Sequence, residues 1–440
     1  MPPAETARSE AGPPTDADAL PAAEQARGRR LALSSHPFQM TFRRLFSEDL
    51  PTLALVSLGA GDAAVGLQRA FEPLSALLQL PALRALRRMS KRRLLLIGQV
   101  VSLVGGLPLV FFATLADLGP ETRVAAALGA LALASVGFGL AETPWFPLLY
   151  GYVPSDRIGR FFGTLRSTWH LALIVSYLGA QQWLARHPGS FGPLFAFGWA
   201  CGFVRVGFAL RFPDRSTGGG PTVRARDGMR ALAGSPELRR YFVGVSLCGG
   251  ARRAITPFAI VVMRRVIGMS EAQVLVATVA SFAGGLLALY AAGRLADRLG
   301  SAPVFRWSAL GLAALSLGLC GLREPGTTSV AIAAALFCGI AALSAAFGVA
   351  DTNVLFSLAP AANPAPVLTA AAASTAVSYA AAPLLAGAAL EIALSNGVDE
   401  LLAYRALFVV AAIVFAVSWI PLRGFRDPES APDEAPPSTV

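Results

Sequence analysis

Residues 40–49 read MTFRRLFSED and place two basic and two acidic side chains directly before a long apolar segment. Arg43 and Arg44 could bind an anion, because the planar guanidinium group makes bidentate contacts with carboxylate or phosphate. Glu48 and Asp49 follow at the end of the same stretch and could neutralise these charges. An arginine at the centre of a membrane span costs about 2.5–3.5 kcal/mol, so such charges must be paired or hydrated.

The second half of the chain repeats this pattern. The segment LGAGDAAV at 58–65 matches IGMSEAQV at 267–274, which lies 209 residues further along. Two arginines and an acid recur at the same offset: Arg43 corresponds to Arg252, Arg44 to Arg253, and Glu142 in FGLAET to Asp351 in FGVADT. Several matches at one offset indicate two repeated halves, which is a known architecture of transporters.

The composition is that of a polytopic membrane protein. Apolar residues make up 54% of the 440 residues and charged residues 15%, against roughly 45–50% and about 25% in globular proteins. Many stretches of about 20 residues are almost free of charge, which is the length that crosses the hydrocarbon core. We expect an all-α integral membrane protein with twelve transmembrane helices, near 31–58, 64–83, 94–116, 123–150, 161–184, 192–212, 239–267, 273–292, 303–322, 328–357, 366–393 and 401–422.

The arginines between the spans predict the orientation. They gather in RALRRMSKRR (84–93), in the central linker and in 294–306, and cytoplasmic loops carry such an excess. We therefore expect both termini to be cytoplasmic, in a bacterial-type inner membrane. The predicted organisation is a disordered tail (1–30), a six-helix bundle (31–212), a cytoplasmic linker (213–238), a second six-helix bundle (239–422) and a second tail (423–440).

Several other kinds of protein are excluded by the sequence. The net charge of +10 comes from arginines between spans, so we expect no nucleic-acid partner. The single lysine, Lys91, does not form a phosphate-binding Gly-Lys-Ser/Thr motif. The three histidines are far apart and the four cysteines lie singly in apolar stretches, so no metal or cofactor site is expected. No nucleophile motif is visible, and we do not expect an enzyme.

Two segments resemble the major facilitator superfamily. Residues 293–300, GRLADRLG, are similar to the loop signature of that family, and VPSDRIGRFFGTL (153–165) resembles the segment that joins its fourth and fifth helices. The corresponding loop in the first half lacks the signature, because arginine stands at 84 and 88 in place of glycine and aspartate. The resemblance implies that Gly293, Asp297 and Arg298 are loop-motif residues and that Asp297 braces a neighbouring helix end.

The resemblance also implies two pseudo-symmetric six-helix bundles and a secondary transporter that works by alternating access. In that family helices 1, 4, 7 and 10 line the central cavity, and these helices would carry the repeated charges. Arg43, Arg44, Arg252 and Arg253 are then candidate binding residues for an anionic or zwitterionic substrate. Glu142, Asp351, Glu48 and Asp49 are candidate gating or proton-coupling residues. Of these, Glu142 and Asp351 would pair with the arginines in the empty cavity. Substrate would replace this ion pair and favour protonation of the freed carboxylate.

Three alternatives remain open at this point. The charges could form a static network that fixes the helices, the protein could be a transport-dead sensor or scaffold of the same fold, or it could export drugs or metabolites. We expect a monomer in the lipid bilayer with a small-molecule substrate. Two local pairings are also predicted: Arg69 with Glu72, which are three residues apart on one helix, and Arg205 with a partner in the first half.

Overall fold

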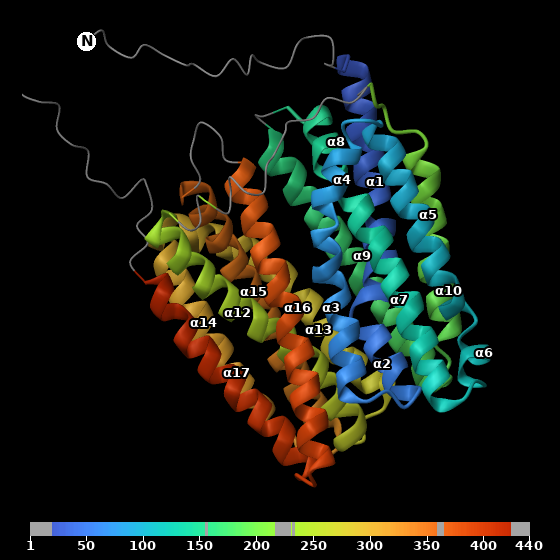
Figure 1. The fold of residues 1–440 in the computed structure, drawn as a ribbon, viewed down its shortest axis with the longest axis vertical. Coiled ribbons are helices and arrows are strands. Elements are labelled where there is room, and N and C mark those ends of the chain that lie inside the picture. The colour runs from blue at the N-terminus through green and yellow to red at the C-terminus, as the bar shows by residue number, and fades with distance from the viewer. Residues whose placement is uncertain (1–19, 155–156, 216–229, 231–233, 359–364, 424–440) are drawn as a thin grey trace, which may run out of the picture.

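The computed structural model describes residues 20–154, 157–215, 230, 234–358 and 365–423. The described residues form helices that pack as two bundles, one from each half of the chain (Figure 1). The predicted tails at 1–19 and 424–440, and most of the predicted linker, lie outside the described residues. Each of the twelve predicted spans coincides with a helix or with two consecutive helices.

The N-terminal bundle contains six spans, four of which are interrupted. Its helices are α1 (Ala22–Ser47), α2 (Asp49–Ser57), α3 (Asp62–Leu77), α4 (Gln79–Ala85), α5 (Lys91–Val110), α6 (Phe112–Ala116), α7 (Pro120–Glu142), α8 (Trp145–Tyr152), α9 (Ile158–Arg186) and α10 (Gly192–Ala209). Helix α1 begins nine residues before the expected Leu31, so residues 22–30 are helical instead of belonging to a disordered tail. Apolar residues mark where a chain enters the membrane, and a helix can start well before that point.

The C-terminal bundle has longer, less interrupted helices. They are α12 (Pro236–Val261), the π-helical turn η3 (Val262–Val266), α13 (Glu271–Leu299), α14 (Ser301–Leu319), α15 (Thr327–Leu358), α16 (Ala365–Ser395) and α17 (Glu400–Leu422). Helix α12 and η3 together correspond to α1 and α2 of the first half. The two bundles therefore share an order of helices while differing in where those helices break.

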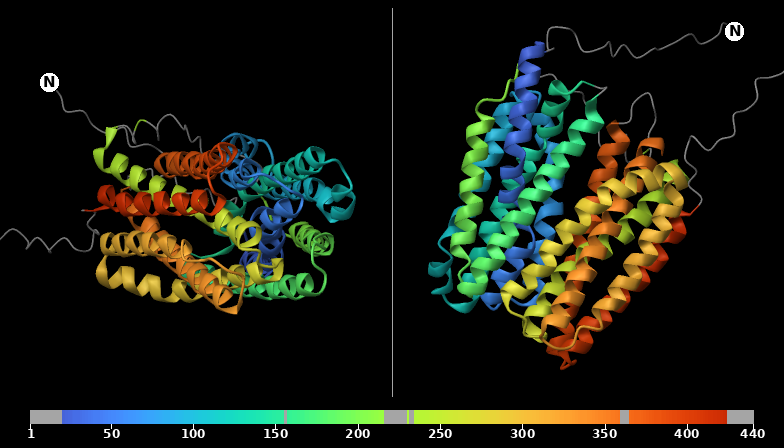
Figure 2. Two further views of the ribbon diagram at one scale, coloured as in Figure 1. Left: turned by 90° about the horizontal axis from the view of Figure 1, so that it is seen from below. Right: turned by 180° about the vertical axis from the view of Figure 1, so that it is seen from behind.

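The two bundles are joined at one end and separate at the other (Figure 2). The start of α1 and the end of α17 lie at the end where the bundles spread apart, which we call the separated end. At the opposite end, the joined end, the start of α3 contacts the C-terminal bundle through hydrogen bonds from Arg265 and Tyr404 to Asp62.

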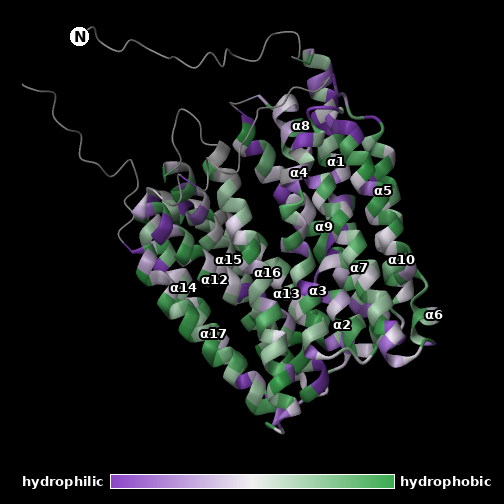
Figure 3. Cartoon of the chain, in the orientation of Figure 1, coloured by the Kyte–Doolittle hydropathy of each residue, from purple (hydrophilic) through white to green (hydrophobic). Residues whose placement is uncertain are grey.

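The outer faces of the helices suit a lipid environment. Large apolar side chains such as Leu287, Leu385 and Val175 are 63–70% exposed, and hydrophobic residues run along the outer helices (Figure 3). Nine helices in the described part of the chain are long and apolar enough to cross a membrane. The other three predicted spans, in α1–α2, α3 and α9, do not meet those limits. Helix α3 has 16 residues, the α1–α2 span carries several charges, and α9 contains many polar uncharged residues that lower its hydropathy.

The repeated loops occupy equivalent places in the two bundles. Gly59 and Gly268 have φ values of 80° and 78°, and each precedes the next helix by three residues. Such φ values strain side chains with a Cβ atom, so glycine suits both positions. Asp62 and Glu271 are the first residues of α3 and α13, where a carboxylate interacts favourably with the helix dipole. These features agree with the 209-residue offset.

Close contact between α5 and α7 depends on glycine. A Cβ atom at Gly137 would collide with the backbone nitrogen and the Oγ of Ser102, whereas one at Gly129, on the same helix, would meet nothing within 4 Å. We expect Gly137→Ala to destabilise the protein by about 1–3 kcal/mol through overpacking and Gly129→Ala to leave stability unchanged. Thermal melting of the purified variants checks this, and equal melting temperatures would show that α5 and α7 can move apart freely.

Candidate functional site

The site begins at a break in the first span. Helix α1 ends at Ser47 and α2 starts at Asp49, with Glu48 between them in a non-helical conformation. Pro51 explains the break, because a proline ring clashes with the carbonyl four residues earlier, which here is Ser47. The break separates the two neighbouring acids, and each has a different arginine partner. The prediction of one continuous helix over 31–58 is therefore wrong.

Arg44 and Arg69 are paired by the acids at this break. Arg44 forms an ion pair with Glu48, one turn along the chain. Arg69 on α3 forms an ion pair with Asp49, with 2.5 Å between Nη2 and Oδ1. The predicted pair between Arg69 and Glu72 is wrong, because each residue instead finds a partner on another helix.

Arg43 connects three helices of the N-terminal bundle. Its Nη1 lies 2.6 Å from Glu142 Oε2 on α7, and its Nη2 lies 3.1 Å from Glu72 Oε1 on α3. Glu142 is the last residue of α7, directly before Thr143 and Pro144 interrupt the span. The structure thus pairs Glu142 with Arg43, one of the four arginines expected as its partners. It also adds Glu72, which sequence reasoning did not place in the site.

Glu72 also joins the two bundles. Its Oε2 lies 2.8 Å from Arg253 Nη1 on α12, while its Oε1 holds Arg43. One carboxylate therefore bridges an arginine from each half of the chain. The side chain of Glu72 is 11% exposed, so these contacts form in a largely buried setting where ion pairs are strong and their loss is costly.

Arg252 differs from Arg43, Arg44, Arg69 and Arg253, because it has no carboxylate partner in the described part of the chain. Its guanidinium lies 3.5 Å from the carbonyl oxygen of Ser344 on α15, and none of the described carboxylates is within 4.0 Å of it. It lines a cavity of about 320 Å³ between the bundles. The same cavity is lined by Arg44, Glu48, Asp49, Arg69, Trp169, His170, Arg253 and Thr256, among other residues.

Asp351 does not form the ion pair that the repeat predicted. Its carboxylate accepts a hydrogen bond from the hydroxyl of Tyr241 on α12, and no arginine of the described part of the chain lies within ion-pair distance of it. Helix α15 continues past Asp351 to Leu358, whereas α7 stops at Glu142. The two equivalent acids therefore differ in both partner and backbone, and the charged network belongs mainly to the N-terminal bundle.

The segment that resembles the family loop signature lies inside a helix. Gly293 and Arg298 belong to the last turns of α13, which ends at Leu299, and Gly300 follows with a φ of 81°. The side chain of Asp297 lies outside the described part of the structure. The bracing role that the resemblance assigns to Asp297 stays a prediction.

A second polar cluster closes the joined end. We call Asp62, Arg265 and Tyr404 the Asp62 cluster. Asp62 Oδ1 accepts a hydrogen bond of 2.6 Å from the Tyr404 hydroxyl, and Arg265 Nη1 lies 3.3 Å from Asp62 Oδ2. Arg265 also donates to the carbonyl oxygen of Ala60 at 2.8 Å. Since Asp62 is 2% exposed and its partners come from the other bundle, this cluster holds the two halves together.

Two further contacts extend this closure. The Glu391 carboxylate on α16 accepts a hydrogen bond of 2.9 Å from the backbone N–H of Ala63, at the start of α3. Glu271, the counterpart of Asp62, accepts a 2.9 Å hydrogen bond from the backbone N–H of Gly189 and forms an ion pair with Arg264.

The repeated loop motif pointed to Asp62 and Glu271, whereas nothing in the sequence singled out Tyr404 or Glu391.

Metal chemistry receives no support from the described residues. In the described part of the chain, no three histidine, cysteine or acidic side chains are grouped so that they could hold an ion. All four cysteines are free thiols, with Cys201 and Cys248 buried. The charged groups that face the cavity are arginines and carboxylates, which suit the binding of a charged solute.

Comparison with known proteins gives the family. The model of the Major Facilitator Superfamily matches residues 39–349 and 241–439. No curated protein sequence matches the chain.

Solved transporters share the fold. The nucleoside transporter NupG is 13% identical over 92% of this chain and 100% of that chain, with a TM-score of 0.68. A POT family transporter in complex with 5-aminolevulinic acid is 14% identical over 90% and 95%, with a TM-score of 0.66. A bacterial homologue of the iron transporter ferroportin, in an inward-facing state, is 16% identical over 90% and 98%, with a TM-score of 0.67. These similarities, the two helical bundles and the match along most of the sequence show that the chain is a multi-pass membrane transporter of the major facilitator superfamily.

Proposed function

We propose that the protein is a secondary active transporter of a small anionic or zwitterionic solute, which binds at Arg252 in the central cavity. The supporting observation is the charge of the site. Arg43, Arg44, Arg69 and Arg253 are ion-paired with the carboxylates at 48, 49, 72 and 142, whereas no described carboxylate lies within 4.0 Å of Arg252. Asp351 interacts with Arg252 only electrostatically and is hydrogen-bonded to Tyr241. The charge of Arg252 is therefore not balanced by a direct ion pair. A carboxylate or phosphate group on the substrate would balance it, and the guanidinium fork suits either group.

Glu72 gives the proposal a mechanism. It holds Arg253 beside the cavity and Arg43 in the N-terminal bundle. An anion that binds Arg252 would lie near Arg253, its neighbour in the chain, and would compete with Glu72 for it. Loss of that contact would weaken the ionic connection between the bundles, so substrate binding would favour their rearrangement. Glu72 and Glu142 would then share Arg43 alone, and two carboxylates beside one arginine favour uptake of a proton by one of them, which would couple proton and anion movement.

The orientation in the membrane is part of the proposal. The arginine-rich segment 84–93 joins α4 to α5 at the separated end (Figure 1), so the positive-inside rule makes that end cytoplasmic. The structure would then be the inward-facing state, as the ferroportin homologue is described.

Labelling of introduced cysteines tests this orientation. Cysteines introduced at Gly119, Gly189 and Gly326 should react with a membrane-impermeant thiol reagent from outside the cell. Labelling from the cytoplasmic side alone would reverse the topology.

The anion proposal is tested by a stabilisation screen. Purified protein is heated with a panel of small carboxylates and phosphate monoesters, each beside its neutral amide or alcohol. We expect selected anions to raise the melting temperature of the protein and the matched neutral amides or alcohols to have no effect.

We call an anion that raises the melting temperature the active anion. Arg252→Gln should weaken binding of the active anion by about tenfold to a hundredfold, since a hydrogen bond to a charged group contributes about 1.5–3 kcal/mol.

Arg186→Gln is the matched control, because Arg186 is exposed at the end of α9 and is not among the cavity-lining residues. If Arg252→Gln binds the anion as well as Arg186→Gln does, the anion site is elsewhere. If only neutral solutes stabilise the protein, the charged network is structural and the substrate is not an anion.

A further inference from the structure

A row of buried and half-buried polar side chains runs along α1, away from the central cavity. Ser35, His36 and Gln39 lie on the turns that precede Arg43. Ser35 is fully buried and Gln39 is 8% exposed. Neither His36 Nδ1 nor Gln39 Oε1 has a hydrogen-bond partner among the described residues. His36 Nδ1 and Gln39 Oε1 are therefore buried atoms without the partners that polar atoms normally keep.

Two other helices bring polar groups to the same level. A Cβ atom at Gly202 on α10 would touch both Leu103 on α5 and Phe42 on α1, so these three positions lie side by side. One turn further toward the separated end, the same helices carry Arg205, Gln99 and Gln39. Gln99 is 1% exposed and Arg205 is 2% exposed. Gln99 Oε1 and Arg205 Nε also lack partners among the described residues.

Arg205 is a buried cation without a paired carboxylate in the described structure. It donates a hydrogen bond to Ser35 Oγ, and its guanidinium carbon lies 4.3 Å from the ring centre of Trp145 and 5.0 Å from that of Phe212. Cation–π contacts recover part of the cost of burial but leave Nε without an acceptor. A charged group in this setting requires further solvation, because an unsatisfied buried charge costs several kcal/mol.

Water is the ligand that suits this set of atoms. Arg205 Nε is a donor, the two amide oxygens are acceptors, and His36 Nδ1 can act as either, depending on its tautomer. A water molecule can donate to some of these atoms and accept from others. Buried waters typically make about three hydrogen bonds to polar groups that would otherwise have none. The cluster offers four such atoms on three helices.

The polar row continues to Glu142. Arg43 lies one turn beyond Gln39, its Nε has no partner in the described structure, and its Nη1 binds Glu142. Glu142 is faced by Arg43 from α1 and interacts electrostatically with Arg205 from α10, while Arg43 also binds Glu72 from α3. His36 interacts electrostatically with both Arg205 and Arg43. These groups thus lie close enough inside the N-terminal bundle to act on one another electrostatically.

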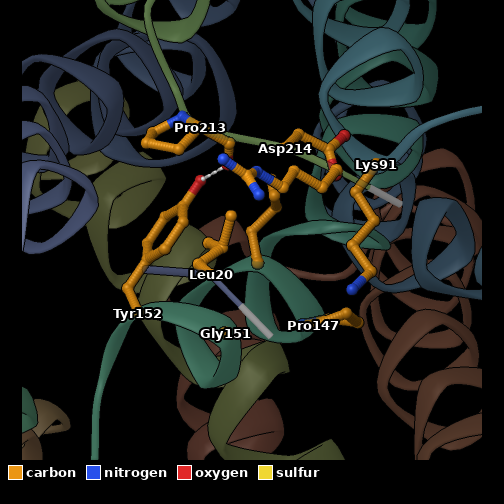
Figure 4. A pocket seen from close by; sticks show the side chains of 9 residues that line it. Leu20, Lys91, Pro147, Gly151, Tyr152, Pro213 and Asp214 are labelled. Carbon is orange, nitrogen blue, oxygen red and sulfur yellow. Dashed lines mark hydrogen bonds between the residues drawn. The ribbon is translucent and has the colours of Figure 1, made fainter. Parts of the chain in front are cut away.

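Aromatic side chains separate this region from the surface. Trp145 stacks on His36 with ring centres 5.4 Å apart, and Phe212 lies between Trp145 and Tyr152. Tyr152 lines a surface pocket with Lys91, Pro147 and Asp214 (Figure 4), and its hydroxyl donates a 2.7 Å hydrogen bond to the carbonyl oxygen of Pro213. The buried cluster is therefore one aromatic layer away from a polar pocket.

We propose that the N-terminal bundle holds a cluster of buried water at Ser35, His36, Gln39, Gln99 and Arg205, and that this cluster carries protons to Glu142 by a route separate from the central cavity. The route enters beside Tyr152, passes Arg205 and ends at the Arg43–Glu142 pair. The hydration site stands on the buried polar atoms alone, while the proton route rests on the coupling role proposed for Glu142.

The hydration site is tested without any substrate. Hydroxyl radicals generated from water by an X-ray pulse oxidise side chains next to bound water. We expect Trp145, which is 5% exposed, to be oxidised severalfold more slowly in the double variant Gln39→Leu/Gln99→Leu than in the wild type.

Two controls accompany this measurement. Trp199, whose indole N–H donates a hydrogen bond to the Leu103 carbonyl oxygen, should be oxidised equally in the double variant and the wild type. Gln182→Leu makes the same change at an exposed position and should match the wild type. Equal oxidation of Trp145 in all three proteins would show that the cluster holds no water.

The proton route is tested by infrared spectroscopy after a step to acidic pH. The carboxylic acid band of Glu142 is identified by its absence in Glu142→Gln. We expect this band to rise at least an order of magnitude more slowly in Gln39→Leu/Gln99→Leu than in Gln182→Leu, with the same final height. An unchanged rate would mean that protons reach Glu142 through the central cavity. Neither readout depends on anion binding at Arg252, so failure of that proposal would be seen separately.

Discussion

Asp62→Ala is expected to shift the protein from the state described here toward one that opens at the joined end. The substitution removes the carboxylate that accepts hydrogen bonds from Tyr404 and Arg265, both of the other bundle. Removing one partner of a buried ion pair typically costs about 3–5 kcal/mol. When the joined end opens, water can solvate these groups, so the cost falls mainly on the closed arrangement. A difference of about 3 kcal/mol changes the ratio of the two states by more than a hundredfold.

Distances between spin labels measure this shift. Labels at Glu121 and Asn396 report on the joined end, and labels at Gly151 and Leu299 report on the separated end; all four positions are exposed. We expect the first distance to lengthen and the second to shorten in Asp62→Ala. Asp117→Ala is the matched control, since Asp117 is exposed in the loop before α7. Unchanged distances in Asp62→Ala would show that the Asp62 cluster does not determine which end is open.

Glu72→Gln is expected to bind the active anion about tenfold more tightly while transporting it more slowly. In the wild type Glu72 holds Arg253 at 2.8 Å and competes with the anion for it. The neutral amide competes less well, and a gain of about 1.4 kcal/mol corresponds to tenfold in affinity. Transport should slow because the bundles lose the ionic contact that the empty carrier uses to return, and because the anion leaves more slowly.

This result separates a binding site from a static network. If the ion pairs only fix the helices, Glu72→Gln should lower the melting temperature and weaken anion binding, because Arg43 and Arg253 would both lose a buried partner. Titration of the purified variant with the anion, combined with uptake into proteoliposomes, distinguishes these outcomes. Glu324→Gln, at an exposed position after α14, should behave as the wild type in both measurements.

The sequence predicted the parts of the site that are repeated. The matching loops indicated that Asp62 and Glu271 occupy equivalent positions, and each begins a helix in the structure. A pairing of Glu142 with the repeated arginines was expected because the family resemblance places them around one cavity and a membrane span cannot bury charge alone. Both inferences depend on local chemistry or on a fixed offset, which are readable without knowing how the helices pack.

The contacts between helices were not predictable in this way. Spacing along α3 suggested a pair of Arg69 with Glu72, yet Asp49 and Arg253 are the partners that helix packing supplies. The partner of Asp351 is Tyr241, which has no equivalent in the first half, because Ala32 stands at the matching position. A repeat predicts the positions of the acids along the chain. It does not predict which neighbouring side chain forms the hydrogen bond or ion pair with each acid. The early start of α1 at Ala22 was missed because hydropathy marks the membrane boundary.

The most direct test of the proposed site is a structure of the protein with the anion selected by the stabilisation screen. We predict that an oxygen of the carboxylate or phosphate group lies about 2.7–2.9 Å from a guanidinium nitrogen of Arg252. We also predict that Arg253 has left Glu72, so that their 2.8 Å contact is lost. An anion bound away from Arg252, with the contact between Glu72 and Arg253 intact, would contradict the account.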